Sequence, residues 1–280
     1  MEGLSKILKK KVQLSGVELT SPVSTSKRKS EAEIFNEMPG KIKGYDCKLC
    51  NNKGIFYLMQ GDELVSRECD CMKTRYTMDR IEASGLKALF EKYTFENYEL
   101  HKEGQTEKQV KIRKELYDLC RDFESNTGGR SLLLAGQAGV GKTHLCTAIC
   151  SSLINKGYEV RYMQWKADTA ALKAIANMPE YAQKLEKLKT VDVLYIDDLF
   201  WTNEDQKPTA GDVNIAFDII NYRYINSDSL ITLISTNKNF MKLMAIDETV
   251  ASRIYEMCGK DHVKIIKEDP SLNYRFIQAS

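Results

Sequence analysis

The stretch Ser131-Leu-Leu-Leu-Ala135-Gly136-Gln-Ala-Gly-Val-Gly141-Lys142-Thr143-His144 decides the fold of this 280-residue chain. Its apolar start predicts a buried strand over 131–135, and the apolar run after the glycines predicts a helix over 142–156. The glycine spacing is that of a P-loop, in which backbone N–H groups at a helix N-terminus converge on phosphate oxygens. The simpler alternative is a glycine-rich turn before an ordinary helix. The predicted phosphate-binding residues are Gly136, Gln137, Ala138, Gly139, Val140, Gly141, Lys142, Thr143 and His144.

Polar residues after two further strands complete this prediction. Val191-Asp-Val-Leu-Tyr-Ile-Asp197-Asp198 ends an apolar run with two carboxylates, although taken alone such acids can also be solvated helix caps. With the P-loop upstream, we expect Lys142 to contact the β- and γ-phosphates and Thr143 and Asp197 to hold Mg²⁺, while Asp198 orients or deprotonates the attacking water. Asn237 follows the apolar run 230–235, where it would face the γ-phosphate or simply favour a turn.

Helix-like and strand-like runs alternate from residue 108 onward. This alternation predicts an α/β fold with right-handed βαβ crossovers and a parallel sheet covered on both faces. The expected helices span 108–124, 142–156, 167–188 and 212–226, and the expected strands span 131–135, 159–163, 192–196 and 230–235.

Four of the eight cysteines form two close pairs, Cys47-Lys-Leu-Cys50 and Cys69-Asp-Cys71. The runs 55–59 and 63–68 flank a turn at 60–62 and predict a β-hairpin that brings the pairs together around one structural Zn²⁺. Three alternatives stay open: another residue as one ligand, reduced thiols, or an Fe–S cluster, although the hairpin spacing favours zinc. The remaining cysteines lie among apolar residues and are expected to be inert core thiols, namely Cys120, Cys146, Cys150 and Cys258.

The charge of the chain is unevenly distributed. The 41 Lys and Arg against 39 Asp and Glu give +2, yet residues 1–30 carry seven basic and two acidic side chains, so the remainder is −3. Leu4, Ile7, Leu8 and Val12 predict a short basic amphipathic helix ahead of a Ser/Pro-containing linker. Because no apolar run reaches the roughly 18 residues of a membrane span and the start lacks a secretory signal, we expect a soluble, cytoplasmic protein without membrane contact.

The motifs together resemble the AAA+ ATPases, and more narrowly the DnaC/DnaI-like helicase loaders and their IstB-like transposition relatives. The features that carry this resemblance cover about residues 45–280. They are Gly141-Lys-Thr-His144-Leu, Ile196-Asp-Asp-Leu199, Ser235-Thr-Asn237, Tyr222-Arg-Tyr224, Ala251-Ser-Arg253-Ile, Ala83-Ser-Gly85-Leu86 and Tyr93-Thr-Phe-Glu-Asn-Tyr98.

The resemblance implies an AAA+ three-layer sandwich with a short C-terminal end, because the 27 residues after Arg253 are too few for a full lid domain. The expected regions are a basic extension and linker (1–40), a zinc-binding module (41–80), a connecting segment (81–107) and the AAA+ ATPase domain (108–280).

It also implies roles for three arginines. Arg253 corresponds to the arginine finger that reaches ATP on the neighbouring subunit, Arg275 to a second sensor, and Arg223 to a residue that acts between subunits. For each of them the alternative is an ordinary surface arginine. Asp stands at 198 where Glu is more common, so we expect slow ATP hydrolysis that assembly or DNA stimulates.

The expected function is ATP-dependent loading of a hexameric replicative helicase onto single-stranded DNA. Residues 1–80 would dock on the helicase, although the basic N-terminal stretch could instead contact DNA or be a solvated arm. Lys184, Lys187 and Lys189 would contact DNA, although they equally suit an exposed helix face. Subunits would associate through their ATP sites. The implied cofactors are ATP, Mg²⁺ and Zn²⁺. Two alternatives stay open: an IstB-like helper of a transposase on duplex DNA, and an adaptor that binds nucleotide without hydrolysing it.

Overall fold

The computed structural model describes residues 31–43, 46–60, 63–101, 104–127, 131–203 and 206–277. The expected helix at 4–12 and the turn at 61–62 lie outside this part of the chain. The chain is divided into two compact units, Met1–Asp79 and Arg80–Ser280, and the boundary between them falls inside helix α3 (Cys71–Ser84). Each unit is described separately below.

The N-terminal unit is built on the predicted hairpin. Strands β1 (Ile55–Gln60) and β2 (Glu63–Glu68) pair antiparallel, with Tyr57 opposite Ser66. The side chain of Asn36, in helix α2 (Glu31–Glu37), donates to the Tyr57 carbonyl at 2.8 Å and accepts from the Tyr57 N–H at 2.9 Å. This amide therefore satisfies backbone groups on the outer edge of β1, which would otherwise be unpaired.

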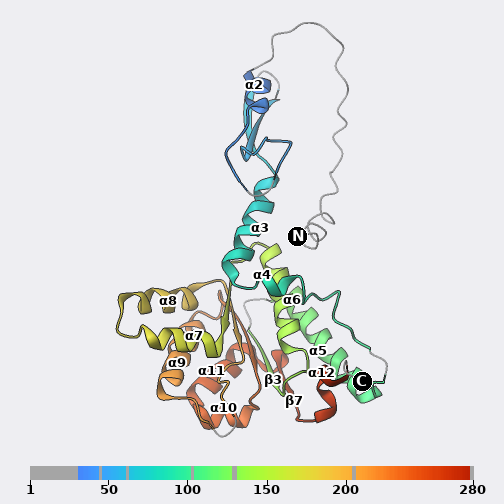
Figure 1. The fold of residues 1–280 in the computed structure, drawn as a ribbon, viewed down its shortest axis with the longest axis vertical. Helices are drawn as coiled ribbons and strands as arrows, with labels where there is room; N and C mark the ends of the chain where they lie inside the picture. Colours follow the sequence, from blue (N-terminus) through green and yellow to red (C-terminus); the bar gives the residue numbers. More distant parts are fainter. Residues whose placement is uncertain are drawn as a thin grey trace. The chain divides into compact units, whose positions relative to one another are not determined.

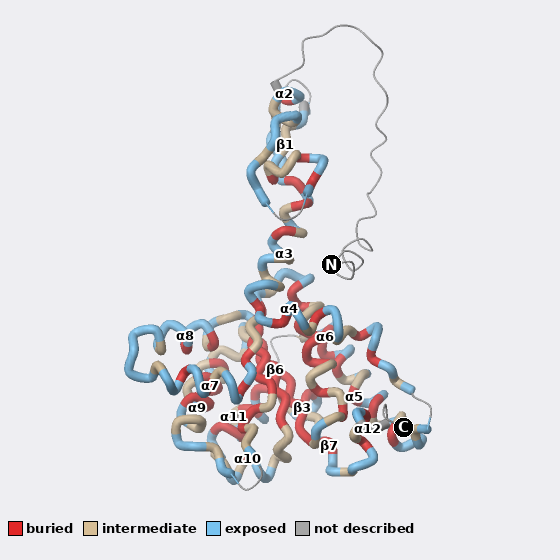
Figure 2. Tube along the Cα trace, viewed as in Figure 1, coloured by how far each residue is buried: buried red, intermediate tan, exposed pale blue. Residues whose placement is uncertain are grey.

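The second unit is built on a parallel five-stranded sheet with the order β4-β5-β6-β3-β7. Strands β3, β5 and β6 are buried along their whole length, as Figure 2 shows for β3 and β6. Apolar residues fill both faces of these strands, as parallel sheets require. The five strands are β3 (Leu132–Gly136), β4 (Val160–Gln164), β5 (Val193–Asp197), β6 (Ile231–Thr236) and β7 (Val263–Ile266).

Helices cover both faces of this sheet and make it the middle of three layers (Figure 1). Leu132 and Leu134 pack into one core with α5 and α6, while Leu133 and Ala135 pack into a second core on the opposite face. The alternation follows from the two-residue period of a strand. On the first face lie α4 (Lys87–Phe90), α5 (Glu107–Ser125) and α6 (Lys142–Asn155). On the second lie α7 (Trp165–Ala174), α8 (Pro179–Thr190), α9 (Ala210–Ile225), α10 (Phe240–Ile246) and α11 (Glu248–Cys258).

The prediction of one helix over 167–188 is wrong, because two helices, α7 and α8, occupy this region. Pro179 is the first residue of α8, and Met178 before it has an extended backbone (φ −105°, ψ 149°). A proline disfavours the helical conformation of the residue before it and fits the first turn of a new helix, so the chain breaks here.

The chain continues after α11 through the short helices η1 (Lys260–His262), η2 (Pro270–Leu272) and α12 (Tyr274–Ile277), with β7 between the first two. Within the described ranges, none of the helices has the combination of length and apolar character that crossing a membrane requires.

Candidate nucleotide and metal sites

The P-loop lies between β3 and α6, as the sequence predicts. Gly139 and Gly141 both have positive φ, 83° and 96°. A Cβ atom on Gly139 would lie 1.9 Å from Asn273 Oδ1, so only glycine fits this position. The backbone from 137 to 141 thus forms a tight loop ahead of the N-terminus of α6, the geometry that binds phosphate in P-loop proteins.

Lys142 folds back over this loop and is only 6% exposed. Its Nζ donates to the Gly136 carbonyl at 2.7 Å and to the Gln137 carbonyl at 2.8 Å. Burial lowers the pKa of Lys142, while the negative charges of Asp198 and Asp197 oppose this effect. The Lys142 amine is therefore held on the loop by two of its carbonyls, within the electrostatic influence of two acidic residues.

Asp197, at the end of β5, is buried and surrounded by hydroxyl groups. Its Oδ1 accepts hydrogen bonds from Thr143 Oγ1 at 3.1 Å, from Tyr195 OH at 2.6 Å and from Ser235 Oγ, and its Oδ2 accepts from Tyr162 OH at 3.0 Å. These donors fix the orientation of the carboxylate. Thr143 and Asp197, the residues expected to share Mg²⁺, therefore lie in contact.

The sequence analysis did not identify Tyr162 and Tyr195 as part of this site. Tyr195 precedes Asp197 by two residues in one strand, so both side chains lie on the same face. This spacing can be read from the sequence alone. Tyr162 comes from β4, opposite Tyr195 in the register, and only the pairing of β4 with β5 brings it to Asp197.

Asp198 lies just beyond the strand with φ 58°, a left-handed conformation that is uncommon for residues other than glycine. Its backbone N–H donates to Ser235 Oγ at 3.1 Å, which ties the end of β5 to β6. Burial, followed by the neighbouring Asp197 carboxylate, raises the pKa of Asp198. The residue thus combines the special backbone and the shifted pKa that often mark functional acids.

Asn237 follows β6, the strand that lies between β3 and β5. Its Oδ1 is buried and has no hydrogen-bond partner among the described residues. A buried acceptor without a donor is costly, so this atom is suited to a bound donor such as a water molecule. The oxygen donors of Thr143 and Asp197, the glycine loop and the Asn237 acceptor together fit a magnesium–nucleotide complex at the carboxyl end of the sheet.

His144 is oriented toward the segment 93–98 that precedes the core. Its Nε2 lies 2.7 Å from the Thr94 carbonyl, and its ring centroid is 5.0 Å from those of Tyr93 and Tyr98. Of the other loop residues, Val140 is buried and Ala138 is exposed.

The three arginines singled out by the resemblance have different environments. The guanidinium of Arg253 lies 5.0 Å from the Phe217 ring centroid and 5.7 Å from that of Tyr224. Its Nη1 is buried without a hydrogen-bond partner in the described part of the chain. Arg275 is exposed. Burial lowers the pKa of Lys142 and raises that of Asp198, and the charge of Arg275 adds a smaller lowering contribution to each.

The implied role of Arg223 between subunits is wrong for this fold, because its side chain is fully buried. The guanidinium donates to Thr232 Oγ1 at 2.8 Å and to the carbonyls of Lys189 and Val191, both at 2.9 Å. It therefore satisfies carbonyls at the end of α8, which a helix C-terminus leaves unpaired. Arg223 stabilises the core.

Lys184, Lys187 and Lys189, the expected DNA-contacting residues, lie on α8, where the first two are exposed and Lys189 is half-buried.

The four paired cysteines form one buried cluster in the N-terminal unit. Their sulfur atoms all lie within 4.8 Å of one another, with 3.7 Å from Cys47 to Cys69 and 3.5 Å from Cys50 to Cys71. Four ligands at the usual Zn–S distance of about 2.3 Å in a tetrahedron would lie about 3.8 Å apart. The donor set therefore fits a closed structural zinc site.

The backbone around the cysteines supports this fit. The Gly54 N–H donates to Cys50 Sγ at 3.3 Å, and the Cys47 N–H donates to Asn52 Oδ1 at 2.9 Å. Asn51 and Asn52 have positive φ, 47° and 63°, which turns the chain sharply after Cys50. N–H groups directed at a thiolate stabilise its charge, the usual arrangement around metal-bound cysteine.

Comparison with known proteins places this architecture in a family. Residues 46–271 match the family model described as IstB-like ATP binding protein. The uncharacterized protein YqaM of Bacillus subtilis is 35% identical over 219 residues, which cover 75% of this chain and 66% of YqaM. The phage-like element PBSX protein XkdC of the same organism is 33% identical, with 80% and 83% coverage. The replicative helicase loader DnaC of Escherichia coli is 31% identical, but the match spans 48% of this chain and 52% of DnaC.

Among solved structures, a DNA replication initiation factor superimposes with a TM-score of 0.50 at 21% identity, covering 67% of this chain and 53% of that chain. At this identity the similarity concerns the fold, which is the AAA+ P-loop arrangement expected from the sequence. The family model spans far more than half of the chain. The chain therefore belongs to the IstB-like ATP-binding protein family, which includes DnaC-like helicase loaders.

Proposed function

We propose that the chain is an ATP-dependent loader that places a hexameric replicative helicase on single-stranded DNA. The observation that carries the proposal is the convergence of Lys142, Thr143, Asp197 and Asn237 at one end of the sheet, in a chain that resembles DnaC along half its length. The zinc module favours a loader over an IstB-like transposition helper, since we expect the latter to have a metal-free helical N-terminal region.

The roles of the site residues follow from their positions. The backbone N–H groups of the P-loop and the Lys142 amine would bind the triphosphate, and Thr143 and Asp197 would hold Mg²⁺. Bound Mg²⁺ neutralises phosphate charge. Asp198 would accept the proton of the attacking water, and Asn237 would orient that water through its unpaired Oδ1. Tyr162, Tyr195 and Ser235 keep the Asp197 carboxylate in place.

Arg253 would complete the site of a neighbouring copy of the chain. Its guanidinium lies against Phe217 and Tyr224, and its Nη1 has no hydrogen-bond partner among the described residues, so this atom would be available to a bound ligand. An arginine supplied by a second subunit stabilises transition-state charge and makes hydrolysis depend on assembly. Nucleotide state would thereby control self-association.

The partners are assigned by the same reasoning. The zinc module, with the basic segment before it, would dock on the helicase, and the exposed Lys184 and Lys187 would contact the phosphates of single-stranded DNA.

The decisive experiment is affinity capture with the full chain, with Lys142→Ala and with the matched control Lys260→Ala, in which an exposed lysine far along the chain is changed. We expect capture of a hexameric helicase and measurable ATP hydrolysis by the parent and by Lys260→Ala, and loss of ATP binding in Lys142→Ala. Recovery of a transposase would support the IstB-like helper. ATP binding without hydrolysis under all assembly conditions would support the adaptor.

A further inference from the structure

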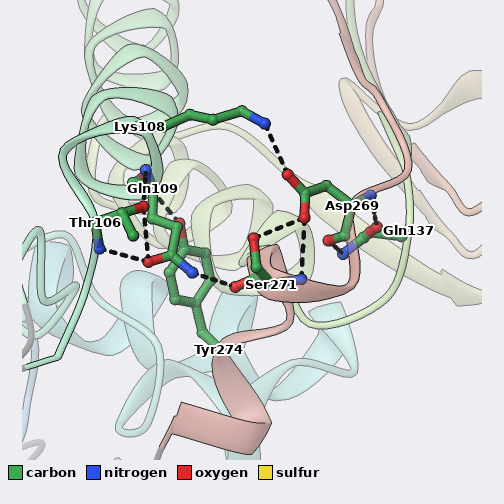
Figure 3. Close-up of polar contacts among 7 residues, drawn as sticks. All are labelled: Thr106, Lys108, Gln109, Gln137, Asp269, Ser271 and Tyr274. Carbon is green, nitrogen blue, oxygen red and sulfur yellow. Dashed lines mark hydrogen bonds and ion pairs between the residues drawn. The ribbon is translucent and has the colours of Figure 1, made fainter.

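The C-terminal segment (residues 269–275) lies against the P-loop, and one P-loop side chain joins the two. Gln137 Nε2 donates to the Asp269 carbonyl at 2.6 Å, and its Oε1 accepts from the Asp269 N–H at 2.6 Å (Figure 3). A side-chain amide that pairs with both backbone groups of one residue fixes the position and the direction of that residue. The Gln137 amide thus satisfies both the N–H and the carbonyl of Asp269, as the backbone of a neighbouring strand would.

A second contact joins the same two parts of the chain. The Tyr274 N–H donates to the Gly139 carbonyl at 3.1 Å, and Asn273 occupies the space where a side chain at 139 would lie. The segment is therefore attached to the P-loop at both of its ends, first at Asp269 and then at Tyr274.

Helix α5 supports the outer side of the segment (Figure 3). Gln109 Nε2 donates to the Ser271 carbonyl at 2.5 Å, and the Tyr274 hydroxyl donates to the Gln109 carbonyl at 2.9 Å. The guanidinium of the buried Arg113 lies between two rings, 4.0 Å from the centroid of Tyr274 and 4.5 Å from that of Tyr98. These contacts hold the segment in one position relative to the P-loop.

Arg275 comes directly after the second attachment point. Its backbone N–H donates to Asn273 Oδ1 at 3.2 Å, so the turn at 273–275 is fixed as well. The Arg275 charge also acts on Lys142 and on Asp198. The location of this arginine therefore depends on how the segment is held.

We propose that Gln137 is a positioning residue of the nucleotide site: its side-chain amide holds the C-terminal segment on the P-loop, and with it Arg275, which directly follows the residue bonded to the Gly139 carbonyl. The effect on hydrolysis rests on the proposed ATPase function, whereas the attachment of the C-terminal segment by Gln137 does not. Gln137 then acts on hydrolysis through Arg275, whereas a P-loop residue at this position would otherwise contribute to phosphate binding through its backbone.

The attachment is tested by hydrogen–deuterium exchange of the full chain, without nucleotide, in the parent, Gln137→Ala, Gln137→Glu and Gln183→Ala. Gln183 is an exposed glutamine on α8 and serves as the matched control. We expect faster exchange in 269–275 for Gln137→Ala and unchanged exchange for Gln183→Ala. Gln137→Glu should be intermediate, because a carboxylate still accepts from the Asp269 N–H but cannot donate to its carbonyl. Parental exchange in Gln137→Ala would overturn the inference.

The consequence is tested with Gln137→Ala, Arg275→Ala and the double variant, by measuring hydrolysis and the binding of a fluorescent ATP analogue. We expect Gln137→Ala to lower kcat on the order of tenfold with little change in analogue affinity, as for a misplaced catalytic group. In the Arg275→Ala background the same change should have no further effect on kcat. Effects that multiply independently would overturn the inference. If the parent did not hydrolyse ATP, the proposed function would fail, while the exchange experiment would still decide the attachment.

Discussion

The position and the pKa of Asp198 lead to a prediction about the pH dependence of hydrolysis. Its carboxyl group is half-buried beside Asp197, and both burial and that second charge raise its pKa. A general base acts only when ionised, so hydrolysis should fall as the pH drops through this raised pKa, above the range of an exposed aspartate. We expect kcat to show an acid limb at this higher pH and Asp198→Asn to lose most of its activity. An Asp198→Asn variant with the parental rate would contradict the assignment.

Arg223 leads to a prediction about stability. Burial lowers its pKa to about 9, so the side chain is still charged at neutral pH and is held by carbonyls and by Thr232. Removing it leaves these buried acceptors unpaired. We expect Arg223→Met to lower the free energy of unfolding by about 3–5 kcal/mol, and Arg223→Lys to recover only part of this loss, because an ammonium group cannot reach all these acceptors.

Chemical denaturation of the purified variants measures this effect, with Arg161→Met as a control at a half-buried position. A loss below about 1 kcal/mol would show that the buried arginine contributes no more than a surface side chain.

Between elements, Glu124 connects α5 to α6. It is buried, accepts from Ser152, and pairs with Lys156 Nζ at 2.7 Å. Burial alone would raise its pKa, but the hydrogen bonds from Lys156 and Ser152 hold the pKa below its ordinary value. A lowered carboxyl pKa stabilises the fold above the pKa of the unfolded state, and this contribution is lost as the pH falls through the folded-state pKa.

We therefore expect Glu124→Gln to lower the free energy of unfolding by about 1–2 kcal/mol at neutral pH, and by progressively less in acid as the carboxylate becomes protonated. The loss is small because Lys156 is partly exposed and water screens the pair. Denaturation curves of both proteins at several pH values measure the difference. A difference that stays constant with pH would rule out the ionic contribution.

The elements also show how far the sequence determines the structure. The P-loop, four of the five strands and the hairpin were predicted, because each depends on local periodicity and on short-range turn residues. Pro179 is a local signal for the break between α7 and α8, but the spacing of the apolar residues favoured one continuous helix. Strand β7 was missed because it spans only Val263–Ile266 and is recognisable only beside β3.

The site residues follow the same division. Asp197, Thr143 and the four cysteines belong to motifs whose spacing can be read along the chain. In the structure Thr143 contacts Asp197, and the four cysteines form a separate cluster. The roles of Tyr162 and Arg223 depend on which strands and helices become neighbours, and no local pattern contains that information.

For the whole molecule, the two units give a prediction about metal removal. The cysteine cluster lies in the N-terminal unit, and the nucleotide site lies in the other. A unit this small buries too little apolar surface to remain folded without its metal. We expect about one zinc per chain, lost in Cys50→Ser and retained in Cys258→Ala, a buried thiol outside the cluster.

Elemental analysis gives the zinc content, and thermal unfolding followed by circular dichroism reports the two units. Chelation should abolish the structure of the N-terminal unit and leave the main transition of the second unit unchanged. A single transition that shifts as a whole on chelation would contradict this separation.

All four clustered cysteines come from one stretch of 25 residues, Cys47 to Cys71. The information for this cluster is therefore contiguous in the gene, whereas the proposed nucleotide site is assembled from positions between 136 and 275. A single recombination event could add, remove or replace the module as one piece. Among related genes, we expect the ATP-binding unit to change by gradual substitution and the cysteine module to be present or absent as a whole.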